Sequence, residues 1–135
     1  MKKLNLILAV VVFVLLSFSA NATKYKFIAE DRSIETKICV FAGSNNKLGL
    51  KHALRQSTGS AITNNRFSVN NITCNDMVMA HFAHKYDAFD TYSYLNRLTN
   101  SKNKIPTTSI EIKDVSAVFN LKNEETKIIY VGSAK

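Results

Sequence analysis

The two cysteines of this chain, Cys39 and Cys74, constrain its fold more than any other sequence feature. In an exported chain, two cysteines predict one disulfide bond, and only one pairing is possible. Closing the loop between them would stabilise the fold by roughly 3–4 kcal/mol in the chain-entropy picture. A catalytic or redox thiol is the alternative interpretation. The pair does not form a Cys-x-x-Cys motif and no histidine closely follows Cys39, so the sequence favours the structural bond.

Residues 1–22 have the pattern of a secretory signal peptide. Lys2 and Lys3 precede an apolar run over residues 4–18, and the small residues Ala20 and Ala22 follow it. A retained membrane anchor is the alternative, but the run of about 15 residues is shorter than the ~20 that a bilayer requires. We therefore expect cleavage after Ala22 and a periplasmic or secreted protein without a transmembrane segment.

The charge of the chain restricts its partners. Removal of 22 of the 135 residues leaves 113, enough for one domain, and the loss of Lys2 and Lys3 lowers the net charge from +8 to +6. This charge lacks the dense clustering of a dedicated nucleic-acid binder, and export separates the protein from nucleic acid. We expect no nucleic-acid partner and no cofactor. Lipid headgroups, envelope polysaccharide or an acidic protein are the anionic partners that fit.

The first part of the mature chain predicts a short strand and a helix. Residues 23–29 alternate aromatic side chains with lysines, which is typical of an extended segment. Asp31 or Ser33 can cap a helix that runs to about Ala42, after which turn residues follow.

The next segment predicts a second helix and then a strand. Apolar residues spaced three and four apart place a helix over residues 47–56. The small and polar residues 57–65 predict a loop, and the alternation over residues 67–74 predicts a strand.

A third helix is expected after Cys74, capped by Asn75 or Asp76. Its apolar stripe is formed by Val78, Phe82, Tyr86 and Phe89. Asp90 and Thr91 can cap a further short helix whose inward residues are Tyr94, Leu95 and Leu98. We expect Tyr92 to lie outside this stripe.

In the C-terminal part of the chain, the spacing of apolar residues changes from the period of a helix to the period of two residues that is typical of a β-strand. Residues 99–108 are polar, contain the only proline, Pro106, and are expected to link the helical domain of residues 23–98 to residues 109–135. Alternating apolar residues before and after a polar turn at 122–125 predict a C-terminal β-hairpin packed on the helices. The sequence therefore predicts an α+β fold, a small, mainly helical domain with one disulfide and a C-terminal β-hairpin.

Three basic residues form the best candidate contact surface. Lys47, Lys51 and Arg55 are spaced four residues apart and align on one side of the second helix. We call these three residues the basic ridge. A solvated helix face is the simpler interpretation, and docking to an anionic partner is the functional one.

The histidines are the other candidates. His81 and His84 lie three residues apart on the predicted third helix, with Asp87 three further on, but a stable zinc site requires three or four ligands. A solvated helix face is therefore the favoured interpretation, and we expect no metal, with His81 and His84 as weak candidates. His52 lies next to the basic ridge, and a hydrolase would need a nucleophile held against it by the fold. No catalytic residue is predicted.

Several short motifs resemble a family of short exported bacterial proteins classed as a domain of unknown function. These motifs are Ile38-Cys39, Leu54-Arg55, Ile72-Thr73-Cys74-Asn75, Phe82-Ala83 and Thr91-Tyr92-Ser93-Tyr94-Leu95. The likeness covers residues 28–98 and rests on the two-cysteine framework and the Cys-Asn step. Asp76 stands where the family pattern predicts glycine, which puts the local turn in question. The resemblance supports the disulfide and the domain limits, and it carries over no functional residue.

The sequence thus favours a non-enzymatic binding or regulatory module of the cell envelope. A small metal-dependent or histidine-using hydrolase and an inhibitor or toxin-neutralising protein are the alternatives. The ligand, the partner and the oligomeric state are not specified by the sequence.

Overall fold

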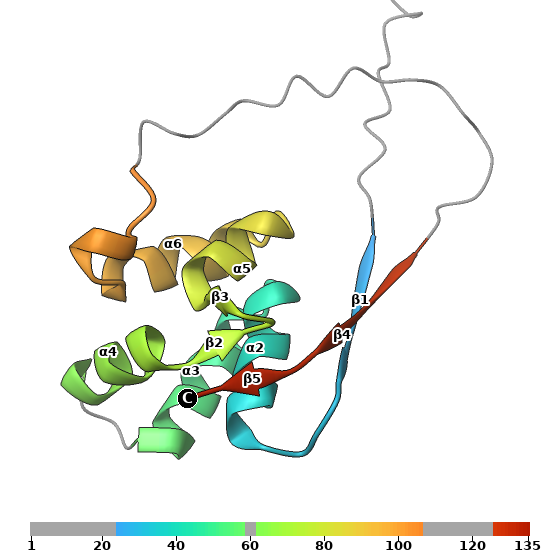
Figure 1. Cartoon of the computed structure of the whole chain (residues 1–135), viewed down its shortest axis with the longest axis horizontal. Helices are drawn as coiled ribbons and strands as arrows, with labels where there is room; N and C mark the ends of the chain where they lie inside the picture. Colours follow the sequence, from blue (N-terminus) through green and yellow to red (C-terminus); the bar gives the residue numbers. More distant parts are fainter. Residues whose placement is uncertain (1–23, 59–61, 107–125) are drawn as a thin grey trace, which may run out of the picture.

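The structure is a computed structural model that describes residues 24–58, 62–106 and 126–135. These residues form the predicted α+β fold, with five α-helices around one core and two small sheets (Figure 1). The helices are α2 (Ile34–Gly43), α3 (Lys47–Thr58), α4 (Ile62–Asn71), α5 (Met79–Lys85) and α6 (Phe89–Leu98), followed by the 3-10 helix η1 (Ser101–Asn103). The strands are β1 (Tyr25–Ala29), β2 (Thr73–Cys74), β3 (Met77–Val78), β4 (Lys127–Val131) and β5 (Ser133–Ala134).

Helix α2 is the centre of the fold, and both its position and its cap match the prediction. Ser33 is the N-cap, and its Oγ accepts a hydrogen bond of 3.1 Å from the Thr36 amide. Ile38 and Ala42 are completely buried, and α2 contacts α3, α5, α6 and both sheets. A helix surrounded in this way has little free surface, so α2 supports the sites on its neighbours.

Helix α4 corrects the loop predicted at residues 57–65 and the strand predicted from Phe67. Helix α3 continues to Thr58, and residues 62–71 form a helix rather than extended chain. Within residues 64–72, whose side chains the structure describes, the buried residues are Asn65, Ser68, Val69 and Ile72, which have helical spacing. Two of the four are polar, so the inward face carries little hydrophobic signal, and Phe67, which suggested a strand, is exposed.

The predicted cap at Asn75 or Asp76 is also wrong, because these two residues form a turn between β2 and β3. Asn75 has φ 46° and Asp76 has φ 60°, which is the pair of left-handed conformations of a two-residue type I′ hairpin. Helix α5 begins later, at Met79. The family pattern predicted glycine at Asp76, and the left-handed backbone explains why glycine would suit this position.

The helix expected to run from Asp76 to Phe89 is divided into α5 and α6. Asp87 lies between them with φ 56°, which an α-helix cannot accommodate. Phe89 begins α6 and is exposed, so it does not belong to the predicted stripe. Tyr92, expected outside the inward stripe, is buried against the His84 ring. Leu95 is buried as predicted.

The two ends of the described chain pair in a parallel sheet. Strand β1 lies beside β4, with Tyr25 opposite Lys127 and Ala29 opposite Val131 (Figure 1). Strand β5 then pairs antiparallel with β2, so the C-terminus joins the three-stranded sheet β3-β2-β5. The return strand of the predicted hairpin is thus present as β4, and its expected partner before residue 122 lies outside the described residues.

The inner face of the β1–β4 sheet packs on α5 through aromatic side chains. The ring of Phe27 lies 5.1 Å from that of Tyr86 and 6.0 Å from that of Phe82. Tyr86 also contacts Tyr25 edge-on at 5.1 Å. Gly43 allows this packing, because a Cβ there would lie 2.6 Å from the Phe27 ring. These contacts attach the sheet to the helices.

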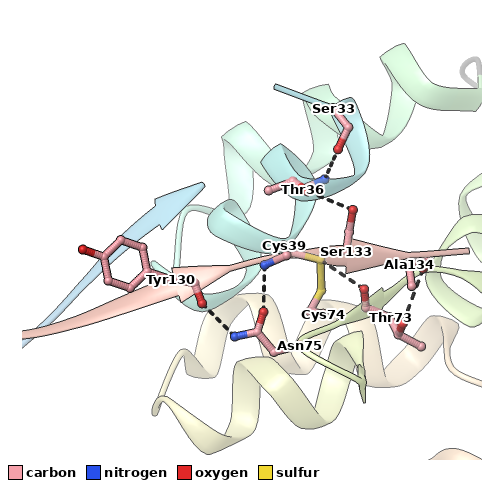
Figure 2. Close-up of a disulfide and its surroundings, with 10 residues drawn as sticks. Ser33, Thr36, Cys39, Thr73, Cys74, Asn75, Tyr130, Ser133 and Ala134 are labelled. Atoms are coloured by element: carbon pink, nitrogen blue, oxygen red, sulfur yellow. Dashed lines mark hydrogen bonds between the residues drawn. A yellow bond between two sulfur atoms is a disulfide. The ribbon is translucent and has the colours of Figure 1, made fainter. Parts of the chain in front are cut away.

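The predicted disulfide joins α2 to β2. Cys39 and Cys74 have Cα atoms 5.5 Å apart and are both completely buried (Figure 2). A hydrogen bond between the hydroxyls of Thr36 and Ser133 lies beside the bond, at 2.9 Å, and ties α2 to β5. The disulfide therefore crosses the contact between the central helix and the three-stranded sheet.

The side chain of Asn75 joins the β2–β3 turn to the C-terminal strands (Figure 2). Its Nδ2 donates to the Tyr130 carbonyl at 2.8 Å, and its Oδ1 accepts from the Gly132 amide at 2.8 Å. The Asn75 amide also donates to the Gly132 carbonyl. An amide side chain has a donor group and an acceptor group side by side. It can therefore pair with a backbone carbonyl and a backbone amide at the junction of β4 and β5.

Candidate anion-binding surface

The basic ridge of Lys47, Lys51 and Arg55 lies on α3, as its spacing predicts. Leu50, Ala53 and Leu54 form the buried side of α3, and the ridge lies on the flank beside it. Arg55 is exposed, whereas Lys47 and Lys51 are half-buried. The three residues span about 12 Å along the helix, at a rise of about 1.5 Å per residue.

Tyr94 of α6 lies against the ridge and is on the same helix as a fourth cation, Arg97. The Lys51 Nζ lies 5.2 Å from the centre of the Tyr94 ring, a cation–π contact. Burial raises the pKa of Tyr94, while the positive charges of Arg55 and Arg97 act in the opposite direction. Lys51 thus contacts the Tyr94 ring, and the charges of Arg55 and Arg97 act on its hydroxyl group. The sequence alone did not place Arg97 near the ridge, because that contact depends on the packing of α6 against α3.

Acidic residues are absent from the segments that build this side of the protein. The sequence has no aspartate or glutamate between Thr36 and Asn75 or between Thr91 and Pro106. These segments contain α3, α4, most of α6 and η1, and α3, α4 and α6 contact one another. Their cations include the ridge together with Arg66, Arg97, Lys102 and Lys104.

The carboxylates of the described residues lie at turns or in first helical turns instead. They are Glu30, Asp31, Glu35, Asp76, Asp87 and Asp90. The single ion pair among residues 24–58, 62–106 and 126–135 joins Lys135 to Glu35, and neither residue belongs to the ridge. Asp90 accepts a hydrogen bond from Asn45, which lies two residues before Lys47, but it forms no ion pair with the ridge. In this part of the chain no carboxylate neutralises the ridge.

Leu48 adds an apolar side chain to this surface. It is 82% exposed, the highest value among the large hydrophobic residues of the described chain. Lys51 and His52 follow it by three and four residues, so they share its side of α3. The outward side of α3 thus combines positive charge with one protruding leucine.

The histidines do not converge on one another. His81 is exposed, and its Nε2 lies 2.8 Å from the carbonyl oxygen of Asn103. His84 packs its ring edge-on against Tyr92, with ring centres 4.9 Å apart. His52 is exposed on α3. Among the residues that the structure describes, no three His, Cys, Asp or Glu side chains are grouped so that they could hold a metal ion.

An open depression lies on another part of the surface, where the C-terminal strands meet the β2–β3 turn. Its volume is about 350 Å³, and its lining residues are Glu30, Asn75, Asp76, Gly132, Ser133 and Ala134. A Cβ on Gly132 would lie 2.7 Å from the Glu30 carboxylate, so any other residue there would displace the Glu30 side chain. Asn75 is already engaged with backbone groups here, and the depression has no buried polar group aimed into it.

None of the helices in the described ranges is both long and apolar enough to span a bilayer.

Residues 38–115 match the model of a family described as "Protein of unknown function (DUF3718)". The match covers more than half of the chain, and the protein belongs to this family. It includes both cysteines and the ridge, and it extends beyond residue 98, where the sequence resemblance was expected to end. Strands β1, β4 and β5 lie outside the matched range. No curated protein and no solved structure matches the chain.

Proposed function

We propose that the protein is an exported, non-enzymatic binding module of the cell envelope, and that it contacts an anionic partner through the basic ridge of α3. The observation that carries this proposal is the arrangement of charge. Lys47, Lys51 and Arg55 lie on one side of α3, and no carboxylate of the described residues pairs with them. The charge of Arg97 acts on Tyr94, the residue whose ring Lys51 contacts.

An unpaired positive surface attracts anions over about one Debye length, which is roughly 8 Å at physiological ionic strength. Each ridge residue can hold an anion without first breaking an internal ion pair. Lys51 is also positioned against Tyr94, so part of its side-chain ordering is complete before a partner binds.

Export is part of the proposal and rests on residues 1–22 and on the disulfide. The charged start, apolar run and Ala-x-Ala end have the composition of a cleaved signal. A buried disulfide is stable in oxidising compartments such as the periplasm.

The test is binding of the protein to a soluble polyanion, heparin, at low and high salt. The variant K47E/K51E/R55E should lose most of its affinity, because three attractions become repulsions. Its matched control is K24E/K26E/K127E, which changes the net charge equally at exposed lysines of the β1–β4 sheet. Equal loss in both variants, or no binding by the wild-type protein, would reject the ridge as the contact.

A further inference from the structure

We infer that the anionic partner is the surface of a lipid bilayer, into which Leu48 inserts while the basic ridge contacts phosphate groups. This inference rests on the proposed function and adds the chemical class of the partner. The observation that carries it is Leu48, because a soluble polyanion gives an exposed leucine nothing apolar to contact.

The position of Leu48 is what favours a lipid surface. It is 82% exposed at the start of α3, directly after Lys47 and on the same side as Lys51. A helix that lies on a membrane needs such a pattern, with an apolar side chain that reaches the acyl boundary and cations at headgroup level. The long stems of Lys47 and Lys51 can lie along apolar surface while their ammonium groups reach phosphate.

The surroundings of Leu48 distinguish it from the other exposed hydrophobic residues. Phe89 is 57% exposed, but Asp87 and Asp90 flank it, and an anionic surface would repel both. Ile128 and Tyr130 are exposed on β4, outside the carboxylate-free segments. Phe67 is 67% exposed in a carboxylate-free segment, but Arg66 is the only cation of its helix, α4. Leu48 alone among these residues lies beside a row of three cations.

The binding expected from one leucine and three cations is weak and reversible. A single Lys or Arg near an anionic leaflet contributes enough for roughly a fivefold change in affinity, so three contribute about 100-fold. Burial of one leucine adds about tenfold or more. Such a site would hold the protein at a membrane rich in anionic lipid and release it at high salt.

The experiment measures sedimentation with vesicles of phosphatidylglycerol and phosphatidylcholine, and with vesicles of phosphatidylcholine alone. Four proteins are compared: the wild type, L48S, F89S and K47E/K51E/R55E. Each is recovered in the form that the expressing cell makes, and intact mass shows whether all share one N-terminus. Any contribution of residues 1–22 is then common to the four. Circular dichroism and thermal melting confirm that each variant is folded.

We expect the wild type to prefer the anionic vesicles. L48S should bind them about tenfold more weakly, with unchanged binding to heparin. K47E/K51E/R55E should lose more than about 100-fold in affinity, because each reversal removes an attraction and adds a repulsion. F89S is the matched control for loss of an exposed apolar side chain, and it should bind the vesicles like the wild type.

Three results would overturn the inference. The first is equal vesicle binding by L48S and F89S, and the second is equal binding to neutral and anionic vesicles. The third is binding to heparin but not to vesicles, which would retain the proposed anion-binding function and reject the lipid partner. A wild-type protein that binds neither heparin nor vesicles would reject both proposals.

Discussion

The disulfide-tied helices and the β1–β4 sheet are held together in different ways. Cys39 and Cys74 link α2 to β2 covalently, inside a core where both side chains are completely buried. The sheet has two strands of five residues and is attached to α5 by the partly buried ring of Phe27 and its neighbours. A two-stranded sheet is marginal in water without such packing. We conclude that the helical part sets the global stability, whereas the sheet depends on it.

The limits of the family match separate the same two parts of the molecule. Helices α3 to α6, the ridge and both cysteines lie within residues 38–115, whereas β1, β4 and β5 lie outside that range. The candidate binding surface is thus built on the disulfide-tied part of the molecule. If the helical part is stable without the sheet, a substitution that unfolds the β1–β4 sheet should leave the ridge folded.

Removal of the disulfide should have the largest effect. The variant C39A/C74A should lose roughly 3–4 kcal/mol of unfolding free energy, because its unfolded chain gains the freedom of an open loop. Urea unfolding under oxidising conditions measures this loss. Two thiols of the native protein that react with an alkylating reagent in the absence of reductant would contradict the bond.

Replacement of Phe27 should have a smaller and more local effect. F27A removes the ring that contacts Phe82 and Tyr86, at a cost of about 2–3 kcal/mol for a partly buried aromatic side chain. Hydrogen exchange should accelerate in β1 and β4 while the amides of α3 keep their protection. Equal acceleration in α3 would show that sheet and helices unfold as one unit.

The ion pair at the C-terminus should contribute least. The hydrogen bond and charge of Lys135 hold the pKa of Glu35 below its ordinary value. A lowered carboxyl pKa stabilises the fold above the unfolded pKa, and this stabilisation is lost as the pH falls through the folded pKa. Because Lys135 is mostly exposed, solvent screens the pair and its contribution is a few tenths of a kcal/mol.

As the pH falls from about 5 to about 3, the melting temperature of E35Q should therefore decrease less than that of the wild type. Asp31, whose pKa is lowered by hydrogen bonds from Ser33, is present in both proteins, so its titration cancels in the difference. Parallel pH profiles would show that the Glu35–Lys135 pair does not stabilise β5.

Sequence reasoning predicted the parts of this fold that local patterns encode. Helix α2 has a capping serine, a regular apolar stripe and turn residues at its end, and the prediction of its limits is confirmed. The cysteine pair needed no pattern at all, since only one bond was possible. The alignment of the ridge residues could also be predicted from the sequence, because residues spaced four apart lie on the same side of a helix.

The errors arose where tertiary contacts override the local signal. Helix α4 buries Asn65 and Ser68 along with Val69, so its inward face has no continuous apolar period. The break at Asp87 and the turn at Asp76 place aspartate in left-handed backbone. Aspartate visits this region more readily than most residues, but only at single positions, so its presence alone does not locate a break. The parallel pairing of β1 with β4 and the contact of Lys51 with Tyr94 depend on the assembled fold, so no local pattern indicates either.

The parallel pairing of β1 with β4 also orders the events of biosynthesis. Tyr25 is made near the beginning of the chain and its partner Lys127 near the end, so a ribosome-bound intermediate lacks the second strand. Contacts between such distant residues form late and slow the folding rate. The β1–β4 sheet therefore forms last, after the helices on which it packs.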